Sequence, residues 1–371
     1  MAEPAPTLAA YGSASLTEVV PALFGTAERE RELLPPAARD AASVVLLAVD
    51  GLGASALEHH AACLPTLVAM DRAVITSVLP ATTAAALTSL TTAAPPTRHG
   101  LVGYRVLVGD HVLNALRWQV EGARNNNRAP DAHEIQRVDA FRGRPVPVVT
   151  KSEFRKTGFT AAHLGAGSFH GWRTVSALVE HCRRLVAAGE RLVYAYYPGV
   201  DEVAHEYGLG DGFYTAELRA TDGLVAQLLD VLPEQCALVV TADHGQVDIA
   251  EDAWVDTHSV APLVHRQSGD ARFRHLHAKP GAANELAQEC ERAFGHLAWV
   301  RTRRRLIDEE WLGARPVPAV GGRIGDVVLM PFEPVGFIDP ALPRERGLRS
   351  AHGAPTADEM LVPLLAARGR A

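Results

Sequence analysis

Four apolar runs, each closed by turn residues, constrain the fold of this chain most strongly. They read SVVLLAVDGLG, AVITSVLP, RLVYAYYPGVD and CALVVTADHG, and cover residues 43–53, 73–80, 191–201 and 236–245. Continuous apolar runs of this length that stop at Asp-Gly, Pro or Gly are typical of buried parallel strands. A weaker run over 157–167 is expected to form a fifth strand.

Helical segments are expected between these strands, over residues 54–70, 83–93, 171–189 and 211–232. Strands that alternate with helices predict a parallel sheet with helices on both faces. The predicted fold class is therefore α/β, a doubly wound α/β/α sandwich on a mostly parallel sheet.

Three stretches fit this alternation poorly. Residues 104–140 and 262–325 are expected to be insertions that form a small cap subdomain. Residues 1–40, rich in alanine and proline, are expected to wrap the surface ahead of a single domain over 41–371.

The composition of the 371 residues excludes several classes of protein. Apolar residues make up 47%, which suffices for a sizeable core, and the net charge of −7 argues against a nucleic-acid partner. The four cysteines lie far apart without a CxxC motif, so a reduced, cytoplasmic compartment is expected. No basic leader precedes an apolar segment and no apolar run reaches the ~20 residues of a membrane span, so no membrane association is expected.

Polar side chains follow the predicted strands where each strand ends. They are Asp50, Thr82, Thr83, Asp201, His205, Asp243 and His244. Ligands of open α/β sheets bind beyond the carboxyl ends of the strands, so these side chains are expected to meet at one edge.

Aspartate oxygens and histidine nitrogens are common ligands of divalent metal ions, and several at one edge can hold two ions ~3.5–4 Å apart. Each motif alone has a simpler interpretation. Asp50 could cap a helix, and Asp201 and His205 could be an i,i+4 helix pair. The DHG motif could arise by chance in a chain with 16 histidines. Their shared position at the ends of successive strands favours a site.

These motifs resemble those of the alkaline phosphatase superfamily, in particular its nucleotide pyrophosphatase/phosphodiesterase and phosphonoacetate hydrolase branch. The segments that carry the resemblance are VVLLAVDGLG, the threonine after the second strand, YYPGVDEVAHEYG, VVTADHG and HGAPTADEMLVPL. They occur in the family's order between about Ser43 and Leu365, which is nearly the whole chain. The resemblance implies an alkaline phosphatase-like catalytic domain over 41–371.

The resemblance also implies two sets of metal ligands. The first set is Asp50, Thr83, Asp243 and His244, and the second is Asp201, His205 and His352. Without the resemblance, the segment AHGAP around His352 reads as a surface loop. The donor atoms suit two zinc ions, and manganese is the alternative.

The nucleophile lies in the uncharged stretch LPATTAAALTSLTTA. In relatives a His-Gly pair follows the threonine by some sixteen residues, and counting back from His99 gives Thr83, with Thr82 as the alternative. Relatives commonly carry an asparagine three residues after the nucleophile, where Ala86 stands here. Either a backbone N–H or a residue from the insertions takes its place, or substrate binding is weaker.

The implied function is metal-dependent hydrolysis of phosphodiester or pyrophosphate bonds in a small-molecule or nucleotide substrate, through a covalent phospho-threonine. Alternatives are a phosphonate hydrolase or phosphomonoesterase of the same superfamily, and, outside the enzymes, a non-catalytic metal-binding module. Monoesterases add an arginine close after the nucleophile, but here the first is Arg98, so diesters are expected to be preferred. The opposite preference would mean that Arg117 or Arg323 reaches the site. The sequence leaves the oligomeric state open.

Overall fold

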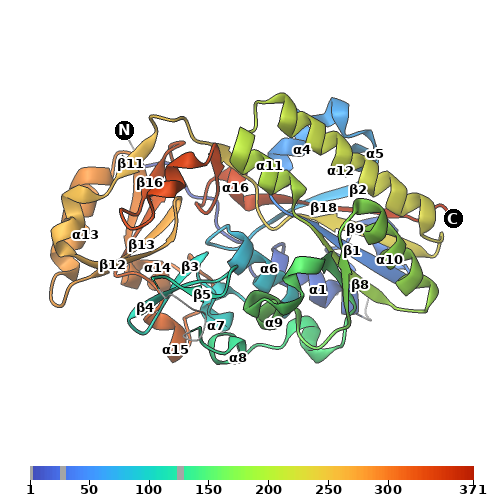
Figure 1. The fold of residues 1–371 in the computed structure, drawn as a ribbon, viewed down its shortest axis with the longest axis horizontal. Helices are drawn as coiled ribbons and strands as arrows, with labels where there is room; N and C mark the ends of the chain where they lie inside the picture. Colours follow the sequence, from blue (N-terminus) through green and yellow to red (C-terminus); the bar gives the residue numbers. More distant parts are fainter. Residues whose placement is uncertain (1–2, 26–30, 123–128) are drawn as a thin grey trace.

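The computed structural model describes residues 3–25, 31–122 and 129–371. A seven-stranded sheet forms the centre, with α10, α12, α4 and α5 on one side and α1, α6 and α9 on the other (Figure 1). A smaller unit built mainly of β12–β15 and α13 lies at the opposite end of the molecule (Figure 1). The α/β sandwich predicted from the sequence is confirmed.

The central sheet has the strand order β2-β18-β9-β1-β8-β6-β7. The strands are β1 (Ser43–Val49), β2 (Asp71–Thr76), β6 (Val148–Lys151), β7 (Phe169–Trp172), β8 (Leu192–Tyr197), β9 (Cys236–Thr241) and β18 (Leu361–Arg368). Strand β1 pairs in parallel with β8 and β9, whereas β18 runs antiparallel to both of its neighbours. The sheet is therefore mostly parallel, with β18 reversed.

The four strong apolar runs form the strands that their sequences predict. Strand β1 is buried from Val44 to Val49, because β8 and β9 flank it and helices cover both faces of the sheet. A strand that exposes neither face needs apolar side chains in both directions, which explains a continuous apolar run rather than an alternating one.

The helices that position the site are α6 (Thr83–Thr92), α10 (Val175–Ala187), α11 (Gly199–Tyr207) and α12 (Gly212–Val231). Three of the predicted helices therefore match α6, α10 and α12. The fourth, over 54–70, is broken into α4 (Ala54–His59), η1 (Ala61–Cys63) and α5 (Pro65–Val68). Pro65 lacks an N–H, so it starts a new helix instead of continuing the previous one.

The expected strand over 157–167 is wrong. This stretch forms α9 (Gly158–Leu164), and the Thr157 side chain caps the helix by accepting a hydrogen bond from Thr160 N. The last two positions on the β8 side of the sheet belong instead to β6 and the edge strand β7, whose four-residue lengths gave too little pattern to detect.

The N-terminal segment enters the core, contrary to the expected surface position. Helix α1 (Leu16–Phe24) buries Leu16, Val19 and Val20 completely and packs against α6. Ahead of α1 the chain contacts the smaller unit, where Trp299 Nε1 donates to Pro4 O over 2.9 Å. The apolar face of α1 drives this burial, because moving leucine and valine side chains out of water lowers the free energy of the folded protein.

The two expected insertions hold separate small sheets. The first contains β3 (Arg105–Val108), β4 (His111–Asn114) and β5 (Gln119–Val120), followed by α8 (Ala132–Ile135). The second contains β12 (Val264–Asp270), β13 (Phe273–Ala278), α13 (Ala283–Phe294), β14 (Ala298–Thr302) and α14 (Arg303–Asp308), and its four-stranded sheet is completed by β15 (Val327–Pro331).

Besides four further 3-10 turns among the described residues, shorter helices and strands connect these elements. They are α3 (Pro36–Arg39), α7 (Pro96–His99), β10 (Val247–Asp248), β11 (Trp254–Asp256), α15 (Pro318–Gly321), β16 (Gly336–Ile338), β17 (Ser350–Ala351) and α16 (Ala357–Met360). Among the described residues, no helix combines the length and the apolar character that crossing a membrane requires.

Candidate metal centre and nucleophile

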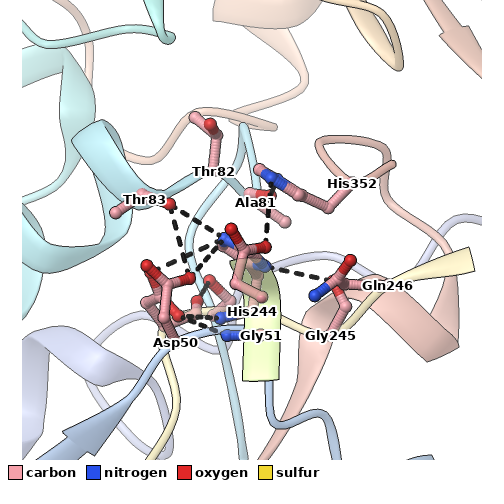
Figure 2. A network of polar contacts seen from close by, with 12 residues as sticks. Asp50, Gly51, Ala81, Thr82, Thr83, His244, Gly245, Gln246 and His352 are labelled. Carbon is pink, nitrogen blue, oxygen red and sulfur yellow. Dashed lines mark hydrogen bonds and ion pairs between the residues drawn. The ribbon is translucent and has the colours of Figure 1, made fainter. Parts of the chain in front are cut away.

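The polar residues expected at the strand ends meet at one edge of the central sheet. Asp50 directly follows β1, Thr83 is the first residue of α6, and His352 directly follows β17. Asp201 and His205 lie on α11, which begins just after β8, whereas Asp243 and His244 follow β9. Figure 2 shows Asp50, Thr83, His244 and His352 around one centre.

The first predicted ligand set is compact and buried. His244 Nε2 lies 3.2 Å from Thr83 Oγ1, 3.4 Å from Asp50 Oδ1 and 3.5 Å from Asp243 Oδ2. Thr83 Oγ1 lies 3.5 Å from Asp50 Oδ1. The threonine hydroxyl therefore shares its surroundings with two carboxylates and an imidazole (Figure 2).

The second predicted set is equally well formed. Asp201 Oδ1 lies 3.3 Å from His205 Nε2 and 3.9 Å from His352 Nε2. The ring Nδ1 atoms donate to backbone carbonyls, His205 to Ser350 O over 2.8 Å and His352 to Ala81 O over 2.9 Å. A proton on Nδ1 leaves the lone pair on Nε2, so both imidazoles present a ligand atom to the centre.

Two groups of three side chains each offer ligand atoms within 4.8 Å of one another. They are Asp201, His205 and His352, and Asp50, Asp201 and His244. The first group is the complete second set. Because Asp201 belongs to both groups, the two positions adjoin.

Burial and mutual repulsion disfavour the charged forms of these clustered side chains when no cation is bound. Burial, together with repulsion from Asp243 and Asp201, raises the pKa of Asp50 well above its usual value, and burial also raises the pKa of Asp201 and Asp243. Burial and the neighbouring imidazoles hold the pKa of His352 well below its usual value. Asp201 Oδ1 and Asp243 Oδ2 accept no hydrogen bond from any described residue. Buried acceptors of this kind are costly unless a cation satisfies them.

The two threonines of the nucleophile stretch face different partners. Thr82 Oγ1 donates to Asp270 Oδ1 over 3.2 Å, away from the ligand sets, whereas Thr83 Oγ1 faces His244 and Asp50. The geometry therefore supports the choice of Thr83. Ala86 is fully buried within α6 and offers no side-chain donor.

Of the two insertion arginines considered from the sequence, only one reaches the site. Arg323 is buried and donates to Gly100 O and Ile135 O, so its guanidinium is engaged elsewhere. Arg117 instead lines a cavity of about 350 Å³ together with Thr83, Asp201 and His352.

A second cavity, of about 220 Å³, also borders Thr83. It is lined by Asp50 and by aromatic side chains that include Phe154, Phe159 and Tyr194. One contact of this region was missed from the sequence. Tyr196 of β8 donates its hydroxyl to Asp50 Oδ2 and orients that carboxylate. The sequence signal was a tyrosine within a fully apolar, buried strand, because a buried tyrosine hydroxyl needs a hydrogen-bond partner.

The mostly parallel α/β sheet, together with the aspartate, histidine and threonine side chains gathered at one of its edges, defines an alkaline phosphatase-like hydrolase. The type I phosphodiesterase / nucleotide pyrophosphatase family model matches residues 44–355, and the chain belongs to that family. The resemblance stated from the sequence motifs is confirmed, and the protein is an enzyme of the nucleotide pyrophosphatase/phosphodiesterase type.

Solved structures share this fold at low sequence identity. Murine ectonucleotide pyrophosphatase/phosphodiesterase 5 is 13% identical with a TM-score of 0.67, and the match covers 89% of this chain and 88% of that chain. An inactive threonine-to-alanine variant of the murine protein, in complex with AMP, is 12% identical with a TM-score of 0.63 and 87% coverage of both chains.

A bacterial structure is similarly close. Phosphonoacetate hydrolase from Sinorhizobium meliloti, in complex with phosphonoformate, is 16% identical with a TM-score of 0.64, and the match covers 89% of this chain and 91% of that chain. A comparison with curated protein sequences finds no significant match.

Proposed function

We propose that this enzyme hydrolyses phosphodiester or pyrophosphate bonds of nucleotide-like small molecules, with two divalent metal ions and a covalent phospho-threonine at Thr83. The observation that carries the proposal is the position of the Thr83 hydroxyl, 3.2 Å from His244 Nε2 and 3.5 Å from Asp50 Oδ1. Membership of the phosphodiesterase family and the AMP complex of the murine relative support this class of substrate.

The residues at the sheet edge fit two metal ions. Two buried carboxylates, the partly buried carboxylate of Asp201, and three imidazoles whose Nδ1 atoms donate to backbone carbonyls provide oxygen and Nε2 donors, which suit zinc and also manganese. Asp201 Oδ1 and Asp243 Oδ2, which lack a hydrogen-bond donor among the described residues, are the acceptors that a cation would satisfy. We assign Asp50, Thr83, Asp243 and His244 to one ion and Asp201, His205 and His352 to the other.

When bound, the ions would lower the pKa of the Thr83 hydroxyl and offset the negative charge of the phosphoryl group. Thr83 would then attack phosphorus in line, forming a bond from its Oγ1 while the bond to the leaving oxygen breaks. Water would cleave the phospho-threonine in the second half of the reaction and restore the hydroxyl.

The first turn of α6 contributes a second stabilising element. Thr83 is its first residue, and the backbone N–H groups at the start of a helix have no partner within the helix. Together with the positive end of the helix dipole they favour an anion, here the phosphoryl oxygens. These N–H groups are our candidates for the role of the asparagine that Ala86 replaces.

The decisive experiment combines a chelation assay with trapping of the intermediate. Turnover of thymidine 5′-p-nitrophenyl phosphate should stop after chelation and return with added zinc or manganese. Acid quenching during turnover should leave a phosphoryl-nucleoside adduct on the peptide that contains Thr83. A protein that binds metal and never turns over a phosphodiester, monoester or phosphonate would instead be the non-catalytic module. The cytoplasmic location stays a prediction.

A further inference from the structure

The reaction cavity continues into a larger one. The cavity of about 350 Å³ beside Thr83 is lined by Arg117 and Leu342 among other residues, and both also line an adjoining cavity of about 750 Å³. The larger cavity lies between the first insertion and β12, as its lining residues His111 and Arg266 indicate. Arg117 therefore stands at the junction between the reacting groups and a space large enough for part of a substrate.

In-line displacement fixes which part of the substrate faces this junction. The attacking and leaving oxygens lie on opposite sides of phosphorus. Asp50 lines the 220 Å³ cavity, His205 and His352 line the 350 Å³ cavity, and Thr83 lines both. With Thr83 assigned to the same ligand set as Asp50, an oxygen that leaves opposite Thr83 faces the second ligand set, which includes His205 and His352. The leaving group therefore extends along the 350 Å³ cavity toward Arg117.

Arg117 is an uncommitted cation at this position. Its side chain is exposed and forms no ion pair with any residue in the described ranges, and only its backbone N–H donates, to Asn114 Oδ1. The arginine deeper in the larger cavity is neutralised, since Arg105 contacts Glu121 and Asp339.

Two of the three acids of the reaction cavity are held by other partners, and the third, Asp201, belongs to the proposed second ligand set. Glu345 pairs with Arg274 Nη2 at 2.7 Å. Asp270 accepts hydrogen bonds from Thr82 Oγ1 and Tyr104 N. The charge of Arg117 is thus available to a ligand.

We propose that Arg117 is a specificity-determining residue that binds an anionic group on the leaving side of the substrate. The enzyme then favours pyrophosphates, and other esters with a charged leaving group, over diesters with a neutral one. The proposal rests on the proposed function and specifies its substrate class. The chemistry is balanced by water alone, because one P–O bond breaks, one forms, and the leaving oxygen takes a proton.

Two matched esters test the proposal. One is thymidine 5′-p-nitrophenyl phosphate, and the other carries one additional carboxylate on the same nitrophenyl ring. The ratio of kcat/KM for the charged ester to that for the neutral ester should fall about tenfold or more in Arg117→Ala, because a hydrogen-bonded ion pair is lost. Comparing the ratio between proteins cancels the intrinsic reactivity of the two leaving groups.

Further variants separate charge from folding. Arg117→Lys should retain part of the preference, and Arg117→Glu should reverse it. In the wild type the ratio should decline as salt rises, because Arg117 is exposed to solvent. Arg266→Ala, an exposed arginine of the larger cavity only, should leave the ratio unchanged.

The charged nitrophenol product supplies a readout without turnover, since its binding measured by equilibrium dialysis should weaken in Arg117→Ala. An unchanged ratio in Arg117→Ala, or an equal drop in Arg266→Ala, overturns the role of Arg117 while the proposed function stands. Absence of turnover of both esters by the wild type overturns both.

Discussion

The hydroxyl of Thr83 lies 3.2 Å from Nε2 of His244, although 161 positions separate the two residues in the chain. One begins a helix after β2 and the other follows β9, and these strands end at the same edge of the central sheet. The contact places the proposed nucleophile, Thr83, among the candidate metal ligands. Its consequences can be tested by substitution.

Thr83→Ala is expected to abolish turnover, with kcat reduced by more than about a thousandfold, because the attacking oxygen is lost. Thr83→Ser should retain part of the activity. Circular dichroism and metal content should stay close to wild type, since the side chain is small and contributes one ligand of several. Thr82→Ala is the matched control. If it proves inactive while Thr83→Ala turns over, the nucleophile is Thr82.

Two equivalents of divalent metal per chain are expected in protein purified without chelator, as measured by elemental analysis. His352→Ala should lose about one equivalent, because it removes one of the three ligands of the second set. Asp201→Ala should likewise lose mainly the ion assigned to the second set. The exposed His59→Ala should keep the full content. A stoichiometry near zero after supplementation would contradict the metal assignment.

Diesters are expected to be better substrates than monoesters. A monoester carries an additional negative charge, and residues 84–97 contain no lysine or arginine to match it. Arg323 is committed to backbone carbonyls, and Arg117 lies on the leaving side. The measurement compares kcat/KM for bis(p-nitrophenyl) phosphate and p-nitrophenyl phosphate. A clear preference for the monoester would contradict this expectation and identify the enzyme as a monoesterase.

Arg272→Ala is expected to lower the free energy of unfolding by about 3–5 kcal/mol, because it leaves a buried carboxylate unpaired. Arg272 binds both oxygens of Glu359 at 2.8 Å, and Glu359 Oε1 also accepts from Ala354 N, two residues beyond His352. Metal affinity should fall as well. The exposed pair of Arg370 with Asp230 is the control, and Arg370→Ala should cost less than about 1 kcal/mol in urea unfolding.

His99 is expected to make stability dependent on pH. Burial lowers its pKa to about 3, and Leu101 N donates to its Nδ1 while Nε2 contacts Ser89 Oγ. Below about pH 6.5 this histidine is protonated in the unfolded chain but stays neutral in the folded one. The free energy of unfolding therefore falls as the pH falls toward 3, by at most about 1.4 kcal/mol per pH unit.

The test of this dependence is a comparison of urea unfolding at pH 7, 6, 5 and 4. His99→Gln should be less stable than wild type at pH 7, because a well-fitted imidazole is lost. The difference should shrink as the pH falls, since the variant carries no proton-linked penalty at this position. A constant difference across the series would show that His99 does not titrate on unfolding. The comparison cancels the contribution of the other histidines.

The sequence alone was sufficient for the central strands and for grouping most of the candidate ligands. A strand buried on both faces needs a continuous apolar run, so β1, β8 and β9 can be recognised in the sequence. Parallel strands end at a common edge, so the polar residues that follow them could be grouped before any contact was known. His352 came only from the resemblance to the family, because its loop carries no local pattern.

Tertiary structure decided the rest, where local preference and long-range packing compete. The run over 157–167 has strand-like composition, yet the Thr157 cap and its place beside α6 make it helix α9. Helix α1 has a short apolar face that does not reveal whether it covers the surface or enters the core. The partners of Tyr196 and Arg117 depend on which strands and insertions lie side by side. Such contacts join residues far apart in the chain, and only the folded arrangement brings their side chains within reach.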